Sequence, residues 1–189
     1  MKKFISIMMT AVMMLSLAAC GGESKDKVSK LDADTDAVTV LETVWQTYGD
    51  DEKFPAAGGD MNNSVMDAPG VFDTADQESL DATLGVPASI AENIDNAASL
   101  MHMMNANTFT CGSYQLKEGA DMETFTTALK DSIMKRQWMC GFPDTLIVVT
   151  LSDSHVVAAF GNAEIIETFK TKLTASYEGA EVIIEESLV

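Results

Sequence analysis

The strongest constraint on the fold is a succession of hydrophobic patterns that occurs twice in residues 96–189. Two strand-like segments are followed by an amphipathic helix, and the same succession then recurs. Turn-forming residues separate the members of each strand pair, Asn105-Ala106-Asn107 in the first pair and Ser152-Asp153-Ser154 in the second,. The expected strands are 97–104, 108–117, 145–151, 155–160 and a last one at 181–189, and the expected helices are 121–138 and 162–177.

The two expected helices carry the same apolar spacing. Phe125 and Leu129 are four residues apart in the first helix, and Phe169 and Leu173 are four apart in the second. Residues at this spacing lie on one face of a helix. We therefore expect both helices to pack in the same way on one antiparallel sheet. This predicts a two-layer α+β domain at 96–189, with the sheet in one layer and the helices together on one of its faces.

Residues 35–95 are patterned less regularly, and we expect them to pack on that domain. Apolar residues at helical spacing predict a helix over 36–48, with Thr35 or Asp36 as its N-cap. Residues 49–74 are rich in Gly, Pro and Asn and show no sustained period, which predicts an ordered but irregular loop,. A short helix is expected over 76–84, before Gly85 and Pro87.

The first twenty residues have the pattern of an export signal. Lys2 and Lys3 precede an apolar run that stops at Cys20 and is too short for a typical membrane span,. The end of the run, Leu17-Ala18-Ala19-Cys20, resembles the lipobox of bacterial lipoproteins. That resemblance implies that the Cys20 thiol receives a diacylglycerol and that residues 1–19 are removed as a signal peptide.

A lipid on Cys20 would hold the chain at the extracytoplasmic face of the bacterial cell membrane, because acyl chains insert into the bilayer. Residues 20–34 are small, polar and charged, which is typical of a flexible tether between an anchor and a folded domain,. The membrane is therefore one expected partner, reached through Cys20.

The formal net charge is −17. Binding to nucleic acid or to an anionic membrane face requires clustered Lys and Arg, so this charge argues against both. The same charge favours solubility, and a cationic ligand or peptide is the alternative that it leaves open.

Two cysteines besides Cys20 have open roles. Cys111 and Cys140 could form a disulfide, since exported proteins commonly contain them,. In the chain-entropy model, closing this loop would stabilise the fold by roughly 3.5 kcal/mol. The alternative is that both are buried free thiols.

Metal chemistry has two candidates in the sequence. Asp32, Asp34 and Asp36 have the spacing that opens a calcium loop, but the glycine and the acid required further along are missing,. Met101-His102-Met103-Met104 offers thioether and imidazole ligands that suit Cu(I), which makes a copper-binding lipoprotein an alternative function,. Alternate residues of a strand point to opposite faces, so these four would not converge. We expect no metal site and no cofactor.

Catalysis has equally weak support. The sequence contains no nucleophile elbow, zinc-protease helix or phosphate-binding glycine loop,. A cell-surface hydrolase or thiol enzyme using Cys111, His102 or His155 is the alternative that we weigh against a non-catalytic protein. We expect no enzymatic activity.

A binding surface is expected where the irregular loop approaches the first strand turn, because long loops commonly carry function. Its candidate residues are Gly58, Gly59, Asp60 and Asn62 in the loop, with Asn105 and Asn107 in the turn.

Several segments of the chain are distinctive in sequence, whereas the overall composition is ordinary. They are Val44-Trp45-Gln46-Thr47-Tyr48, the run from His102 to Thr110, Gln137-Trp138-Met139-Cys140-Gly141-Phe142-Pro143 and Ala159-Phe160-Gly161. In these the chain resembles small uncharacterised lipoproteins of gut clostridia-type bacteria, some of which are labelled bacteriocin transport accessory protein. The resemblance implies a role beside an exporter and carries no catalytic or ligand residues. Together with the anchor, it predicts a non-catalytic surface lipoprotein that binds a protein or a small ligand.

Overall fold

The computed structural model describes residues 31–104, 108–139 and 141–189. The expected signal peptide, Cys20, most of the tether and the residues Asn105, Asn107 and Cys140 lie outside the described residues. Packing begins earlier than expected, because Leu31 is already buried in the core, although the tether was predicted to extend to residue 34.

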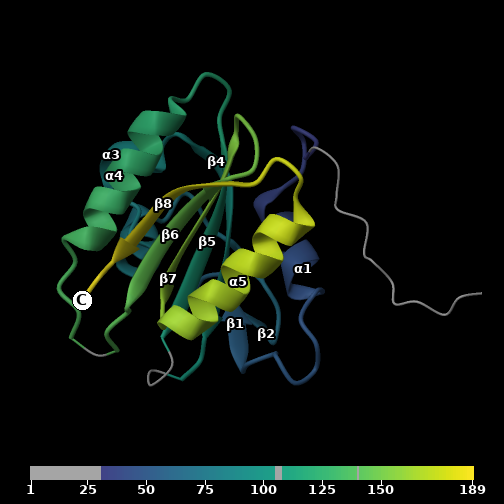
Figure 1. Ribbon diagram of the computed structural model, residues 1–189. Coiled ribbons are helices and arrows are strands. Elements are labelled where there is room, and N and C mark those ends of the chain that lie inside the picture. Colours follow the sequence, from purple (N-terminus) through teal and green to yellow (C-terminus); the bar gives the residue numbers. More distant parts are fainter. Residues whose placement is uncertain (1–30, 105–107, 140) are drawn as a thin grey trace, which may run out of the picture.

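The described chain folds around one antiparallel sheet of eight strands, so its fold class is α+β. The strand order is β2-β1-β4-β5-β7-β6-β8, and β3 pairs with β4 beside β1. The strands are β1 (Ala56–Gly58), β2 (Val65–Met66), β3 (Gly70–Phe72), β4 (Ile94–His102), β5 (Phe109–Leu116), β6 (Thr145–Thr150), β7 (His155–Gly161) and β8 (Glu181–Ser187). Figure 1 shows β5 and β7 crossing the middle of the molecule.

The helices follow local signals in the sequence. They are α1 (Ala37–Trp45), α2 (Gln77–Ser79), the π-helical turn η1 (Leu80–Leu84), α3 (Ala88–Ala91), α4 (Met122–Met134) and α5 (Ala163–Ser176). The side chains of Asp36, Asp121 and Asn162 accept hydrogen bonds from backbone N–H groups in the first turns of α1, α4 and α5,. Helix α4 ends at Met134 and not at the expected residue 138, because Arg136 and Trp138 leave the helix and pack on each other.

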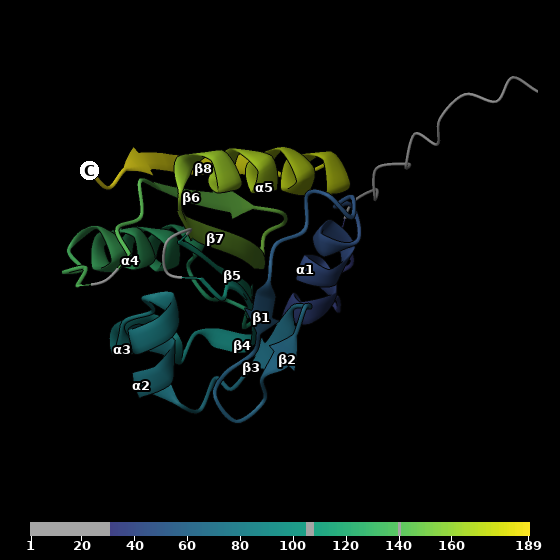
Figure 2. The ribbon, with the colours of Figure 1, turned by 90° about the horizontal axis from the view of Figure 1, so that it is seen from below.

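The helices lie on both faces of the sheet, so the prediction of two layers is not confirmed. Phe125 and Leu129 of α4 belong to one hydrophobic cluster, whereas Phe169 and Leu173 of α5 belong to the other. Helices α1 and α5 cover one face, and η1, α3 and α4 cover the other (Figure 2).

The reason for the third layer lies in the central strands. The four consecutive residues 146–149 of β6 are all fully buried, and every residue of β7 is buried. A strand with apolar side chains on both faces must be covered on both faces, because each exposed face would leave apolar surface in water.

Residues 49–74 are more regular than expected, since they contain β1, β2 and β3. The strand β1 pairs with the end of β4, where Ala56 is opposite His102, and the Met103 N–H donates to the Pro55 carbonyl. This pairing attaches the segment to the end of β4 and brings Phe54 next to the His102 ring.

Candidate functional site

The expected loop surface is mostly interior. Gly58, Gly59 and Asp60 are buried, and Asn62 is exposed. The Asp60 carboxylate accepts hydrogen bonds from the backbone N–H groups of Asn62, Asn63 and Asp73 at 2.7–2.9 Å and from the Asn63 side-chain amide. Burial alone would raise the pKa of Asp60, but these donors outweigh it and lower the pKa below its ordinary value,. These contacts assign Asp60 a structural role.

Cys111 is a free thiol on the central strand β5, and its side chain is fully buried. Burial raises the pKa of this thiol well above its ordinary value, which keeps it protonated at neutral pH,. Because the possible partner Cys140 lies outside the described residues, the structure describes only one half of the expected pair. A buried, protonated thiol is a poor nucleophile.

His155 holds the beginning of the described chain to the sheet. One ring nitrogen, Nε2, lies 2.6 Å from the Thr35 carbonyl oxygen, which can only accept, so Nε2 carries the proton,. The other nitrogen, Nδ1, lies 2.9 Å from Ser152 Oγ and 3.1 Å from Ser154 Oγ. With the side chain buried and both nitrogens engaged, His155 has a structural role.

Within residues 31–104, 108–139 and 141–189, no group of three or more His, Cys, Asp or Glu side chains is placed to hold a metal ion. Within the same ranges, no helix has both the length and the apolar character needed to cross a lipid bilayer.

A small pocket of about 150 Å³ lies at the end of the sheet where β4 ends, β5 begins and β7 ends. We call it the aromatic pocket. Its lining comes from three separate parts of the chain: His102, Met104, Thr108, Phe109 and Thr110; then Trp138, Gly141 and Pro143; and Phe160.

Aromatic contacts hold the wall of this pocket in place. The rings of Trp138 and Phe160 are 5.3 Å apart between centroids. On the opposite side, Phe54 contacts Phe109 edge-on at 5.4 Å and stacks on His102 at 4.8 Å. Offset and edge-on ring pairs are favourable beyond the area that they bury, so the pocket is largely formed without a ligand.

His102 supplies a titratable polar group to this lining. Its Nδ1 accepts a hydrogen bond of 3.0 Å from the Met104 N–H, so the neutral ring carries its proton on Nε2,. Burial lowers the pKa of His102 and favours this neutral form,. Nε2 makes no hydrogen bond with any of the described residues, which leaves one donor available at the pocket.

Four exposed apolar residues line the pocket or are next in sequence to a lining residue, and we call them the apolar rim: Met103, Met104, Met139 and Phe142. Met104 itself lines the pocket, and each of the other three is adjacent in sequence to a lining residue. Their exposed fractions run from 51% to 90%. Grouped apolar side chains exposed to this degree are typical of interaction surfaces, whereas single ones are ordinary.

The aromatic pocket was not predicted from the sequence, although its lining residues lie in three of the distinctive segments, 102–110, 137–143 and 159–161. These segments are far apart along the chain, and only the neighbouring positions of β4, β5 and β7 in the sheet bring them together. Clusters of Trp, Phe and His next to turn residues were the signal that could have indicated it.

The pocket lies at the opposite end of β7 from the beginning of the described chain. His155, at the start of β7, contacts Thr35, and Phe160, near its end, lines the pocket. Five residue steps along a strand correspond to about 17 Å.

Comparison of the chain with family models, with curated proteins and with solved structures finds no match. The geometry of the site is therefore the basis for proposing a function.

Proposed function

We propose that this protein is a non-catalytic lipoprotein, anchored through Cys20 at the extracytoplasmic face of the bacterial cell membrane, which binds a partner protein through the aromatic pocket and the apolar rim. One observation carries the proposal: three distant segments converge on a pocket with aromatic walls, and the residues next to its lining include exposed methionine and phenylalanine side chains.

The energetics favour a protein partner. Burying one Met or Phe side chain is worth about 1.5–3 kcal/mol, so covering several rim residues would supply much of the free energy of a moderate complex. Methionine side chains adapt their shape to different partners, and aromatic side chains are enriched at energetically dominant interface positions. A pocket of about 150 Å³ has room for one inserted apolar side chain of that partner.

The position of the pocket also suits a tethered protein. The chain leading to Cys20 enters the fold beside His155, at the far end of β7 from the pocket. An anchor at that end would leave the apolar rim directed away from the bilayer. A component of an envelope complex, such as the exporter that the family resemblance implies, could reach it there.

Site-specific photocrosslinking in living cells tests this proposal. Phe142 is replaced by the photoreactive p-benzoylphenylalanine, and the matched control carries the same group at Glu178, an exposed turn residue beyond α5. We expect a discrete protein adduct from position 142 and none from position 178. Identical adducts from both positions, or none from 142, would contradict the proposal.

A second pair of variants distinguishes the rim from exposed methionine in general. Met139→Asp places a charge in the rim, and Met61→Asp places the same charge on an equally exposed methionine next to Asp60. We expect Met139→Asp, and not Met61→Asp, to abolish the adduct from position 142 while both proteins keep wild-type melting temperatures.

The anchor is tested separately. Cells fed radiolabelled palmitate should label the wild-type protein and leave Cys20→Ala unlabelled, and only the wild type should remain with washed membranes. Label on Cys20→Ala would refute lipidation at this residue.

A further inference from the structure

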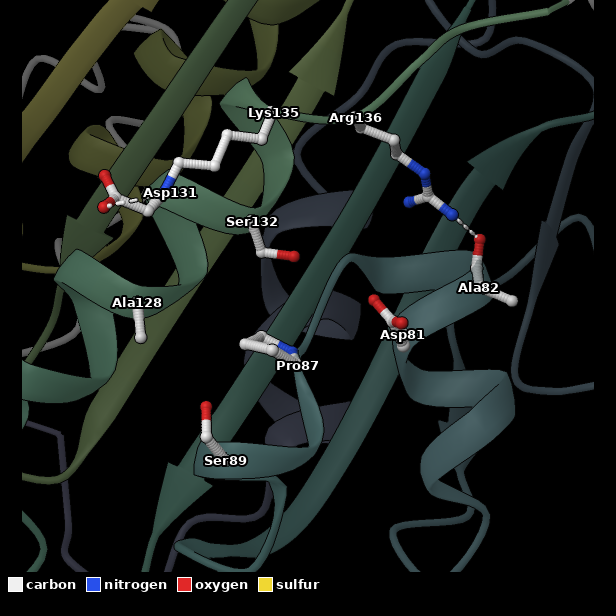
Figure 3. Close-up of a pocket in the computed structure, with 9 residues that line it drawn as sticks. All are labelled: Asp81, Ala82, Pro87, Ser89, Ala128, Asp131, Ser132, Lys135 and Arg136. Carbon is white, nitrogen blue, oxygen red and sulfur yellow. Dashed lines mark hydrogen bonds and ion pairs between the residues drawn. The ribbon is translucent and has the colours of Figure 1, made fainter.

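A second depression, which we call the groove, lies between α4 and the segment formed by η1 and α3 (Figure 3). Its volume is about 650 Å³, within the range of small-molecule sites,. It is lined by Asp81, Ala82, Pro87, Ser89, Ala128, Asp131, Ser132, Lys135 and Arg136. None of these residues lines the aromatic pocket, so an inference about the groove is independent of the function proposed above.

The two walls of the groove are fixed relative to each other. Arg136, the single arginine of the chain, donates from Nη2 to the Ala82 carbonyl and stacks over Trp138 with 5.3 Å between its guanidinium carbon and the ring centroid. Gly85 packs so closely on α4 that a Cβ there would lie 2.7 Å from Ile133. A site with fixed walls loses little entropy on binding.

Polar groups from three elements face this space without partners. No hydrogen bond or ion pair among the described residues engages the Asp81 carboxylate, the Ser89 hydroxyl or the Ser132 hydroxyl. Figure 3 shows Asp81 and Ser132 pointing into the space between η1 and α4. Asp81 also belongs to the π-helical turn, a rare structure that often occurs at functional sites,.

The lining carries two acidic and two basic side chains, in contrast to the net charge of −17 of the whole chain. Lys135 pairs with Asp131 at 3.4 Å, so Asp81 is the unpaired acid and Arg136 still has unused N–H donors,. Ala82, Pro87 and Ala128 add apolar surface. A ligand that matches this lining carries one positive charge, one negative charge and an apolar portion.

We propose that the groove binds a small zwitterion with free amino and carboxyl ends, an amino acid or a dipeptide with apolar side chains. Its ammonium group binds Asp81 with help from the serine hydroxyls. Its carboxylate binds Arg136, because a guanidinium matches carboxylate geometry. Its side chain lies over Ala82, Pro87 and Ala128.

Four matched probes test the charge requirement by calorimetry on the full chain in lipid nanodiscs: leucine, N-acetylleucine, leucinamide and N-acetylleucinamide. We expect leucine to bind, and removal of either charge to weaken binding by up to about fivefold, as the loss of an ion pair at a partly exposed site does. Leucyl-leucine in a parallel titration distinguishes an amino acid site from a dipeptide site by which zwitterion binds more tightly.

Two variants locate the site. Asp81→Asn removes a carboxylate that makes no hydrogen bond or ion pair with any other described residue. As the control, Glu178→Gln removes another exposed carboxylate, which lies beyond α5 and away from the groove. Asp81→Asn should weaken binding of the zwitterion about fivefold and leave N-acetylleucine unaffected, whereas Glu178→Gln should change neither. Melting temperatures check that both variants fold.

Three results would overturn the proposal. The first is the absence of saturable binding of leucine or leucyl-leucine up to about 10 mM. The second is equal affinity for all four matched probes, and the third is an equal change in zwitterion affinity in Asp81→Asn and Glu178→Gln.

Discussion

The imidazole ring of His102 lies parallel to the ring of Phe54, with 4.8 Å between the ring centroids and 11° between the planes. This contact joins residues 49–74 to the end of β4, where the aromatic pocket begins. One wall of the pocket therefore depends on a segment that was predicted to be irregular. Changes in this segment should affect the pocket as well as the stability of the fold.

His102 makes stability sensitive to mild acid. Burial lowers the pKa of His102 below 6.5 in the folded protein, so the unfolded chain binds the proton more tightly,. Its contribution is therefore present above pH 6.5 and is lost as the pH falls from 6.5 through the folded pKa. We expect His102→Gln to show a smaller drop in melting temperature than the wild type between about pH 8 and about pH 5. Parallel curves for the two proteins would refute the assignment.

Asp60 should be among the most sensitive polar positions. In Asp60→Asn, an amide group that can itself donate replaces a carboxylate that accepts from three backbone N–H groups. Leaving a buried donor without a partner costs about 1–3 kcal/mol. Urea unfolding should show this loss for Asp60→Asn, whereas Asn62→Ala, which keeps the backbone donor, should stay within about 0.5 kcal/mol of the wild type.

The same carboxylate has its own pH window. Because the pKa of Asp60 is lowered on folding, its contribution is complete above the ordinary value of 3.8 and is lost as the pH falls through the folded pKa,. Asp60→Asn should therefore reduce the acid sensitivity of the fold below about pH 4, well separated from the effect of His102. Equal acid sensitivity of variant and wild type would contradict this.

Gly58 is required for the close approach of two backbone segments. A Cβ at this position would lie 2.2 Å from the Gly70 nitrogen, a distance that the backbone cannot accept without moving. We expect Gly58→Ala to destabilise the fold by about 3 kcal/mol or more. It should also shift the methyl resonances of Met103 and Met104, since the Met103 N–H bonds to Pro55 just before β1.

Gly119 is the matched control for this substitution. It has a positive φ of 81°, but nothing lies within 4 Å of a Cβ built on it. Gly119→Ala should cost only about 1 kcal/mol, the penalty of the left-handed conformation. Similar losses for the two variants would show that steric contact with Gly70 is unimportant.

Cys111 should be inert in the native protein because its thiol is buried and its pKa is raised. In the double variant Cys20→Ala/Cys140→Ser, which keeps Cys111 as the single cysteine, Ellman's reagent should detect no thiol under native conditions and the Cys111 thiol after unfolding in urea. Native reactivity would show that this part of β5 opens. Titration of unreduced Cys20→Ala in urea then determines whether Cys111 and Cys140 are bonded, since a disulfide leaves neither thiol available.

The positions of most regular elements were predictable because the forces that define them are local. Asp36, Asp121 and Asn162 cap helices through their own side chains, and alternating or apolar runs placed β4 to β8 within a few residues,. The layers were not predictable in the same way. Phe125 and Phe169 have the same local spacing, yet they pack on opposite faces, because the strands that precede their helices, β5 and β7, are antiparallel and connections of the same hand from such strands lie on opposite faces,.

Residues 49–74 show the same limit. Their strands are two or three residues long, and such strands carry no periodic signal of their own,. Pairing with β4 and the close contact of Gly58 with Gly70 stabilise them, and both contacts are non-local.

By itself, the sequence determined the caps, the turns, the main strands and helices, and the resemblance of its first twenty residues to a lipoprotein signal, because each depends on residues close together in the chain. Only the tertiary structure decided that His102, Trp138 and Phe160 share one pocket and that Asp81 and Arg136 share one groove. Those groupings depend on strand order and on the packing of helices against the sheet, which are set by burial of apolar surface over the whole domain.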